Sequence, residues 1–234
     1  MSDEPLPSRS GAATARNVAR LGMRAWRVRV TGLHHVPVDG PVLLAANHLG
    51  ALDGPLLVAA SPRPVHVLAK SELFVAPVDR LLRAGGQVEI EYDGPDRSAL
   101  HLAVRLLADG RAVGVFPEGH RGRGDVAHAR HGLAYLAAGG VPVVPVAVLG
   151  TRGTGSGRDS TPRPGARLDV VYGEPVVVRA DGDVRRRAVL ARAGEQLRQV
   201  LADHVERSCR RTGQVLPADD VRRDAAVPRV EEHA

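Results

Sequence analysis

A histidine and an aspartate five positions apart, His48 and Asp53, are the first residues in this chain whose types and spacing could do chemistry. They lie in the segment Asn-His-Leu-Gly-Ala-Leu-Asp, directly after the apolar run 42–46. A histidine can take a proton from a hydroxyl group near neutral pH, and a neighbouring carboxylate can fix its tautomer and stabilise the imidazolium. The pair therefore indicates general-base chemistry in which a substrate hydroxyl attacks. The alternative is that Asp53 caps a helix beside a structural histidine.

A second polar segment, Phe-Pro-Glu-Gly-His-Arg at residues 116–121, follows another apolar run. Pro117 and Gly119 indicate a tight turn whose backbone N–H groups could meet an anion or a developing oxyanion. Arg121 offers a planar, permanently charged fork for phosphate. Arg123 and Arg130 add positive charge nearby. The alternative is a surface turn with solvated arginines.

The elements that must position these residues alternate between apolar runs and helical segments. The patterns predict strands at residues 42–46, 65–69, 87–92, 112–116, 143–149 and 167–172, and helices at residues 54–60, 75–84, 96–108, 130–138 and 183–211. This alternation is typical of an α/β fold with a mostly parallel central sheet flanked by helices. Both polar segments then follow strands at their carboxyl ends, where such sheets gather their sites.

The length of 234 residues fits a single domain. We expect residues 1–10 to be disordered, residues 11–212 to form the domain, and residues 213–234 to form a flexible tail. The glycine-rich segment 152–165 is predicted to be a flexible surface loop; it lacks the Gly-Lys-Ser/Thr ending of a phosphate-binding loop.

Within residues 11–30, basic side chains recur every three or four positions, which predicts a basic amphipathic helix at the start of the domain. The basic face carries Arg16, Arg20, Arg24 and Arg27, and the apolar face carries Val18, Leu21, Ala25 and Val28. Such a helix either lies on an anionic membrane surface or docks on the domain with its arginines in water.

Composition narrows the class of protein without choosing a substrate. The chain is 44% hydrophobic and 25% charged, as in ordinary globular proteins, and only 3% aromatic, so Leu, Val and Ala must build the core. The net charge of +6 comes almost entirely from arginine, which suits a GC-rich bacterial genome. A single cysteine, Cys209, excludes an intrachain disulfide, and no zinc-type spacing is present. We expect no transmembrane helix, no signal peptide and a cytoplasmic protein.

The two polar segments together resemble the glycerolipid acyltransferase family, whose bacterial prototype (PlsC) is 1-acylglycerol-3-phosphate acyltransferase. Its signature is Asn-His-x4-Asp followed about 70 residues later by Phe-Pro-Glu-Gly-Thr-Arg, and here His48 and Glu118 are 70 positions apart. The segment Lys-Ser-Glu-Leu at 70–73 is similar to the family's Lys-x-Glu-Leu. Val-Pro-Val-Val-Pro at 141–145 is similar to its Val-Pro-Val/Ile-Val-Pro strand. The resemblance covers residues 30–180.

By this resemblance, His48 is the base, Asp53 its orienting carboxylate, and Glu118 and Gly119 shape the acceptor site. Arg121 binds the phosphate of the acceptor, helped by Lys70, which could equally cap a helix. The resemblance implies a lysophospholipid-type acceptor and a thioester donor, acyl-CoA or acyl carrier protein, with no metal or other cofactor. It also implies membrane contact through residues 11–30, peripherally at the inner face of the cell membrane.

One departure from the family affects the acceptor. The family's second motif, Gly-x-Ile-Phe-x-x-Arg, corresponds to residues 86–92 here, so Tyr92 stands at the phosphate-contacting arginine. Either Arg97 replaces that arginine, or the acceptor is not lysophosphatidic acid. His120 also replaces the usual Thr or Ser.

Three alternatives remain beside acyl transfer. The first is a catalytically silent, lipid-binding relative with the same fold, which Tyr92 favours. The second is a nucleic-acid binder, suggested only by the basic charge and opposed by the few aromatic residues and the absence of a recognition motif. The third is a metal-dependent hydrolase, which needs more ligands than the His48 segment offers.

Overall fold

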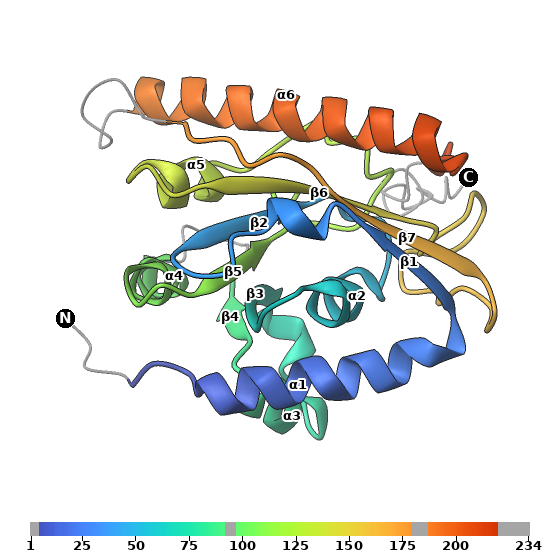
Figure 1. Cartoon of the computed structure of the whole chain (residues 1–234), viewed down its shortest axis with the longest axis horizontal. Coiled ribbons are helices and arrows are strands. Elements are labelled where there is room, and N and C mark those ends of the chain that lie inside the picture. Colours follow the sequence, from blue (N-terminus) through green and yellow to red (C-terminus); the bar gives the residue numbers. More distant parts are fainter. Residues whose placement is uncertain (1–4, 92–96, 179–186, 220–234) are drawn as a thin grey trace, which may run out of the picture.

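The computed structural model describes residues 5–91, 97–178 and 187–219, and within them the chain forms a seven-stranded sheet with helices on both faces (Figure 1). The strands are β1 (Arg27–Thr31), β2 (Val42–Ala46), β3 (Val65–Lys70), β4 (Val88–Ile90), β5 (Ala112–Val115), β6 (Val143–Leu149) and β7 (Arg167–Tyr172). The helices are α1 (Arg9–Gly22), α2 (Asp53–Ala60), α3 (Val78–Ala84), α4 (Arg97–Ala108), α5 (Gly132–Ala137) and α6 (Arg187–Thr212), with short 3-10 turns η1 (Met23–Ala25), η2 (Leu33–His35) and η3 (Ser71–Leu73). The predicted α/β fold class is confirmed.

The strand order is β1-β7-β6-β2-β5-β3-β4. Strand β2 pairs in parallel with both β5 and β6, and β3 pairs in parallel with β5 and β4. Only the β6–β7 pair is antiparallel among the strands described, and β1 pairs in parallel with β7. Because β2, β3, β5 and β6 run in the same direction, the segments that follow them all emerge at one edge of the sheet. Both predicted polar segments therefore reach the same edge.

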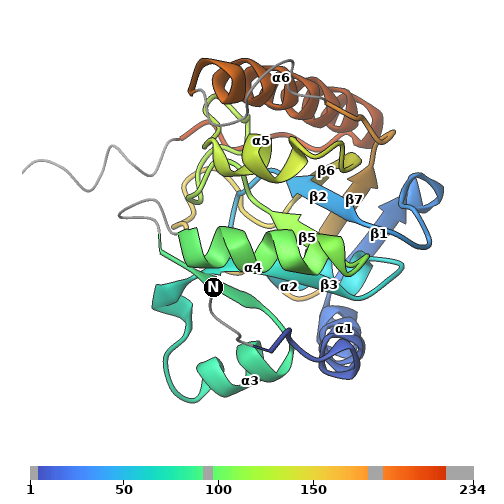
Figure 2. The same cartoon turned by 90° about the vertical axis from the view of Figure 1, so that its left-hand side faces the viewer.

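Two apolar cores, one on each face, hold the sheet between its helices. Helices α4, α5 and α6 cover one face through Leu106, Leu133 and Leu201 (Figure 2). Helix α2 and the turn η1 after α1 cover the other face through Leu57 and Met23. All residues of β2, β5 and β6 are buried, which explains why these strands have continuous apolar runs rather than alternating patterns.

The predicted helix at residues 11–30 is wrong in its last part. Helix α1 ends at Gly22, and residues 27–31 form strand β1, which pairs with β7 at the edge of the sheet. The segment Arg-Val-Arg-Val-Thr alternates in burial with a period of two, as an edge strand does. Arginine spacing alone did not distinguish this strand from a continuing helix, because its partner β7 is about 140 residues further along the chain.

Helix α1 docks on the domain through small residues and arginines. Ala12 of this helix is buried, and so is Met23, the residue that follows the end of the helix. Val18 and Leu21 of the helix are exposed. Arg16 Nη1 donates to the carbonyl of Pro62 at 2.6 Å, and Arg20 Nε donates to the carbonyl of Ala59 at 2.9 Å. Two arginines of the predicted basic face therefore bind the end of α2 and the turn after it.

Pro7, just before α1, and Arg9, in its first turn, contact the domain within the segment where disorder was predicted. Arg111 Nη1 donates to the carbonyl of Pro7 at 2.5 Å, and Arg9 Nη2 donates to a carboxylate oxygen of Asp109 at 2.9 Å. His66 is a neighbour of Arg111, and burial lowers the pKa of its imidazole. Its Nδ1 lies 2.7 Å from the carbonyl of Gly86. Pro7 and Arg9 therefore contact the domain, residues 1–4 lie outside the described part, and the disorder predicted for residues 1–10 stays a prediction.

Most other boundaries agree with the sequence within a few residues. Strands β2, β6 and β7 have the predicted ends, and α3 begins three residues later than predicted. Residues 183–186 of the predicted last helix lie outside the described residues, as do most of the predicted tail. The first residues of the predicted tail contact β7, because Gln214 Nε2 donates to Asp169 Oδ2 at 2.9 Å. Within the described residues, no helix is long and apolar enough to cross a membrane.

Candidate active site

His48 and Asp53 form a direct hydrogen-bonded pair at the carboxyl end of β2. His48 Nδ1 lies 2.7 Å from Asp53 Oδ2. The same Oδ2 accepts the backbone N–H groups of Leu49 at 2.6 Å and Gly50 at 2.8 Å, and Thr151 Oγ1 donates to Asp53 Oδ1 at 2.5 Å. The Asp53 side chain is fully buried, whereas that of His48 is 17% exposed. The imidazole thus has one side on the carboxylate and another toward solvent.

These contacts determine which nitrogen of His48 can act as a base. A carboxylate accepts hydrogen bonds and donates none. Nδ1 must therefore carry a hydrogen and donate it in the hydrogen bond to Asp53 Oδ2. Nε2 of the neutral ring then keeps its lone pair. Asp53 is also the first residue of α2, where the helix dipole favours a negative charge. Its carboxylate binds the N–H groups of residues 49 and 50, which precede the helix, rather than capping the helix itself.

Neighbouring segments fix the backbone of the His48 turn. The side chain of Asn47 continues the β2–β6 ladder, since Nδ2 donates to the carbonyl of Val148 at 3.1 Å and Oδ1 accepts its N–H at 2.7 Å. Glu118 Oε1 accepts the backbone N–H of His48 at 2.8 Å, and the N–H of Gly122 donates to the carbonyl of His48 at 2.9 Å. The two polar segments predicted from the sequence are therefore bonded to each other. Glu118 holds the turn; its predicted role at the acceptor site stays a prediction.

The backbone conformation at Gly119 and the close approach of the Arg130 side chain require a glycine at this position. Its φ is +71°, and a Cβ there would lie 2.4 Å from Arg130 Nε. The N–H of Gly119 donates to the carbonyl of Phe116 at 3.0 Å, so this N–H is used inside the turn rather than presented to an anion. The ring of Phe116 stacks on that of His48 with centroids 4.3 Å apart. Arg130, from the segment before α5, therefore packs against Gly119, and the Phe116 ring packs against His48.

The predicted phosphate-binding cations lie at the same edge but have partners on the protein. Arg121 Nη1 pairs with Asp159 Oδ1, and Lys70 Nζ pairs with Glu72. Lys70 ends β3 and precedes η3 without a side-chain capping bond. Arg97 is exposed and begins α4, and Tyr92 lies outside the described residues. The predicted phosphate-binding roles of Arg121, Lys70 and Arg97 stay predictions.

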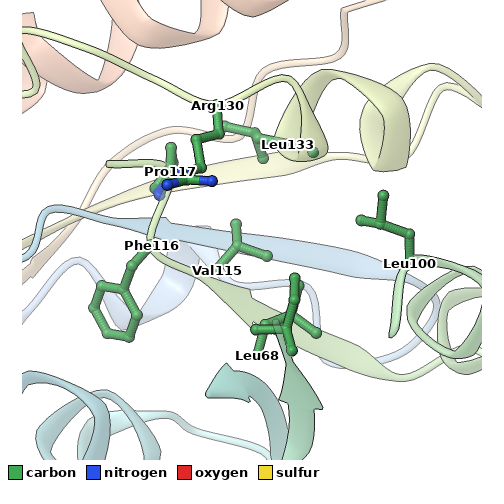
Figure 3. A pocket seen from close by; sticks show the side chains of 9 residues that line it. Leu68, Leu100, Val115, Phe116, Pro117, Arg130 and Leu133 are labelled. Atoms are coloured by element: carbon green, nitrogen blue, oxygen red, sulfur yellow. The ribbon is translucent and has the colours of Figure 1, made fainter. Parts of the chain in front are cut away.

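A shallow apolar pocket, partly open to solvent, lies beside Phe116 (Figure 3). Its wall is lined by Leu68, Ile90, Leu100, Val115, Phe116, Pro117, Arg130, Gly132 and Leu133. Figure 3 shows Arg130 beside Pro117 on one side of the pocket, with Leu100 and Leu68 on other sides. Phe116 lines this pocket and also stacks on His48, which is itself not one of the lining residues. This edge of the sheet therefore combines a histidine–aspartate pair, an apolar pocket and an arginine.

Sequence reasoning missed two residues that follow β6. Thr151 is fully buried and donates to Asp53. The side chain of Arg152 is fully buried, and its Nη2 donates to the carbonyl of Gly122 at 3.0 Å. Polar residues directly after a buried strand were the available signal, but only the adjacency of β6 and β2 connects them with His48. Among the described residues, no group of three His, Cys, Asp or Glu side chains could hold a metal ion.

The fold and the site together define an α/β protein with a histidine–aspartate pair at the carboxyl edge of its sheet. Comparison with known proteins makes this class specific. The family model described as Acyltransferase matches residues 27–149, which include both polar segments. The chain belongs to the Acyltransferase family, as its resemblance to glycerolipid acyltransferases predicted.

Individual relatives agree with this family. The lyso-ornithine lipid O-acyltransferase of Rhizobium meliloti is 30% identical and is matched over 82% of this chain and 75% of its own length. The 1-acyl-sn-glycerol-3-phosphate acyltransferase of Bacillus subtilis is 28% identical over 64% of this chain and 73% of its own. An uncharacterized protein of Mycobacterium tuberculosis is 32% identical, but this chain spans only 42% of its length.

A solved structure supports the fold. The crystal structure of the 1-acyl-sn-glycerophosphate acyltransferase PlsC from Thermotoga maritima superposes with a TM-score of 0.66 at 23% identity. The superposition covers 86% of this chain and 79% of that one. The seven-stranded sheet of this chain is therefore the sheet of a known acyltransferase fold.

Proposed function

We propose that this protein transfers an acyl group from a thioester to the hydroxyl of a lysophospholipid or a related lyso-lipid, with His48 as general base. The observation that carries the proposal is the contact between His48 Nδ1 and the buried Asp53, which leaves Nε2 as the proton acceptor. Lysophosphatidate and lyso-ornithine lipid are the acceptors that the names of the relatives suggest. The donor is acyl-CoA or acyl carrier protein.

The proposed reaction needs no nucleophile from the protein. The acceptor oxygen bonds to the thioester carbonyl carbon while His48 Nε2 takes the hydroxyl proton. The carbon–sulfur bond of the tetrahedral intermediate then breaks, and the imidazolium gives its proton to the thiolate. The products are an ester and a free thiol. Asp53 stabilises the imidazolium in both steps, and the apolar lining of the pocket beside Phe116 is a candidate contact for part of the acyl chain.

A panel of acceptors tests this function. Purified protein is incubated with palmitoyl-CoA and, in separate reactions, lysophosphatidate, lyso-ornithine lipid and other lysophospholipids, and the products are identified by mass spectrometry. We expect free thiol to appear in step with one acylated product and only when an acceptor is present. Thiol release without an acceptor would identify a thioesterase, and no product with either acyl-CoA or acylated carrier protein would reject the proposal.

We further propose that the protein meets the inner face of the cell membrane peripherally, through an apolar surface made by α1 and the α3 region. We call this the α1–α3 surface. Its exposed members are Val18, Leu21, Leu73, Val75, Val78 and Leu81. Leu21 is 63% exposed and Leu81 is 59% exposed. Leu73 and Val75 follow β3, so the surface begins at the same sheet edge as His48. The apolar side chains carry this proposal rather than Arg16 and Arg20, because both arginines bind the domain.

Glutamate at two positions of the α1–α3 surface is expected to weaken membrane binding. Each leucine that no longer enters the lipid interface removes about 1.5 kcal/mol of membrane-binding free energy. The variant Leu21→Glu/Leu81→Glu should therefore bind liposomes at least tenfold less tightly. Co-sedimentation with phosphatidylglycerol-containing liposomes measures this. The control is Val38→Glu, because Val38 is 84% exposed outside this surface. Equal binding of both variants would place membrane contact elsewhere.

A further inference from the structure

Arg121, the predicted phosphate-binding cation, forms an ion pair with Asp159. Arg121 follows β5 in the turn that is bonded to His48 through Glu118 and Gly122. Its side chain is only 19% exposed, and Asp159 is 72% exposed. Asp159 belongs to the connection between β6 and β7, about 40 residues further along the chain. A loop carboxylate therefore neutralises the guanidinium assigned to the acceptor.

We propose that Asp159 is a specificity residue that competes with the anionic headgroup of the acceptor for Arg121. This inference rests on the proposed function, since it assigns a headgroup to the same site. Carboxylate and phosphate bind the same planar fork of a guanidinium, so the two cannot occupy it together. A doubly charged phosphate monoester displaces the carboxylate, whereas a neutral headgroup does not. Asp159 thereby lowers the affinity of the site for acceptors whose headgroup lacks a strong anion.

The loop geometry suits such an exchange. Arg158 Nε lies 3.8 Å from Asp159 Oδ2, so the carboxylate keeps a second cation when it leaves Arg121. Ion pairs with an exposed partner are weak, which makes displacement by a ligand inexpensive. The base of the loop is nevertheless held, because Arg152 donates to the carbonyls of Ser156 and Gly122, each at 3.0 Å. The tip can therefore move while the base stays attached to the His48 turn.

Calorimetric titration of the full chain tests the competition without turnover. Glycerol 3-phosphate is the probe, and glycerol is the neutral comparison. We expect Asp159→Asn to bind glycerol 3-phosphate three- to fivefold more tightly than the unmodified protein, with no change for glycerol. Arg121→Gln should lose most of the binding, alone and combined with Asp159→Asn. Asp125→Asn is the matched control, because Asp125 pairs with Arg123 in the next part of the turn, and it should bind as the unmodified protein does.

The outcomes separate this inference from the proposed function. Equal affinity of the unmodified protein and Asp159→Asn for glycerol 3-phosphate, or no binding by either, overturns the role of Asp159 whatever the enzyme assay shows. A gain in affinity that Asp125→Asn reproduces overturns it too, because the effect would then be general charge. A gain specific to Asp159→Asn supports it, even if the acceptor panel yields no product and the proposed function fails.

Discussion

Replacement of His48 with alanine is expected to lower the rate of acyl transfer by about 10²- to 10⁴-fold, the usual contribution of a general base. In the structure, His48 is the group with a protonated Nδ1 on a buried carboxylate and a second nitrogen directed away from it. Without the imidazole, the acceptor hydroxyl has no group at this position to take its proton. The rate of thiol release from palmitoyl-CoA with a saturating acceptor measures the effect.

The His48→Ala variant needs two controls. His101→Ala removes an exposed histidine from α4 and should leave the rate unchanged. The unfolding midpoint of His48→Ala should be measured as well, since the ring packs on Phe116 and its loss leaves a gap. Turnover within a few-fold of the unmodified protein, in a folded variant, would remove His48 from the mechanism. Liposome binding that survives in a chain with no transfer from any donor would instead favour a silent lipid-binding relative.

Replacement of Asp53 with asparagine is expected to lower the rate to a similar degree, by about 10²- to 10⁴-fold. Asparagine can place its carbonyl oxygen toward His48 Nδ1, Leu49 N and Gly50 N, and its amide toward Thr151, whose hydroxyl can rotate to accept. The geometry is thus tolerated, and the variant removes mainly the negative charge that stabilises the imidazolium. Steady-state kcat for the same transfer reaction reports the loss.

Two further variants show whether Asp53 acts through His48. Thr151→Val removes one of the four hydrogen bonds to the carboxylate and should cost only a few-fold in rate. The double variant His48→Ala/Asp53→Asn should be no slower than His48→Ala alone, because residues that act as a unit are not additive. If Asp53→Asn keeps the full rate, the carboxylate only holds the His48 turn through its bonds to the N–H groups of Leu49 and Gly50.

The sequence by itself predicted the elements whose signals are local. Continuous apolar runs predicted the ends of β2 and β6 because both faces of those strands are covered by helices. The spacing of arginines in residues 11–30 was misleading at its end. The edge strand β1 exists because β7 offers it a hydrogen-bonding partner, and no local signal reports that partner.

The same division holds for the site. Residue types and their place after buried strands made His48, Asp53 and Arg121 candidates, and the resemblance to glycerolipid acyltransferases supplied their predicted roles. The tertiary structure decided what each one touches: Thr151 on Asp53, Glu118 on the backbone of His48, and Asp159 on Arg121. These contacts join segments 38 to 98 residues apart. They depend on the strand order that places β2 between β5 and β6, which is set by packing across the whole sheet rather than by any stretch of the chain.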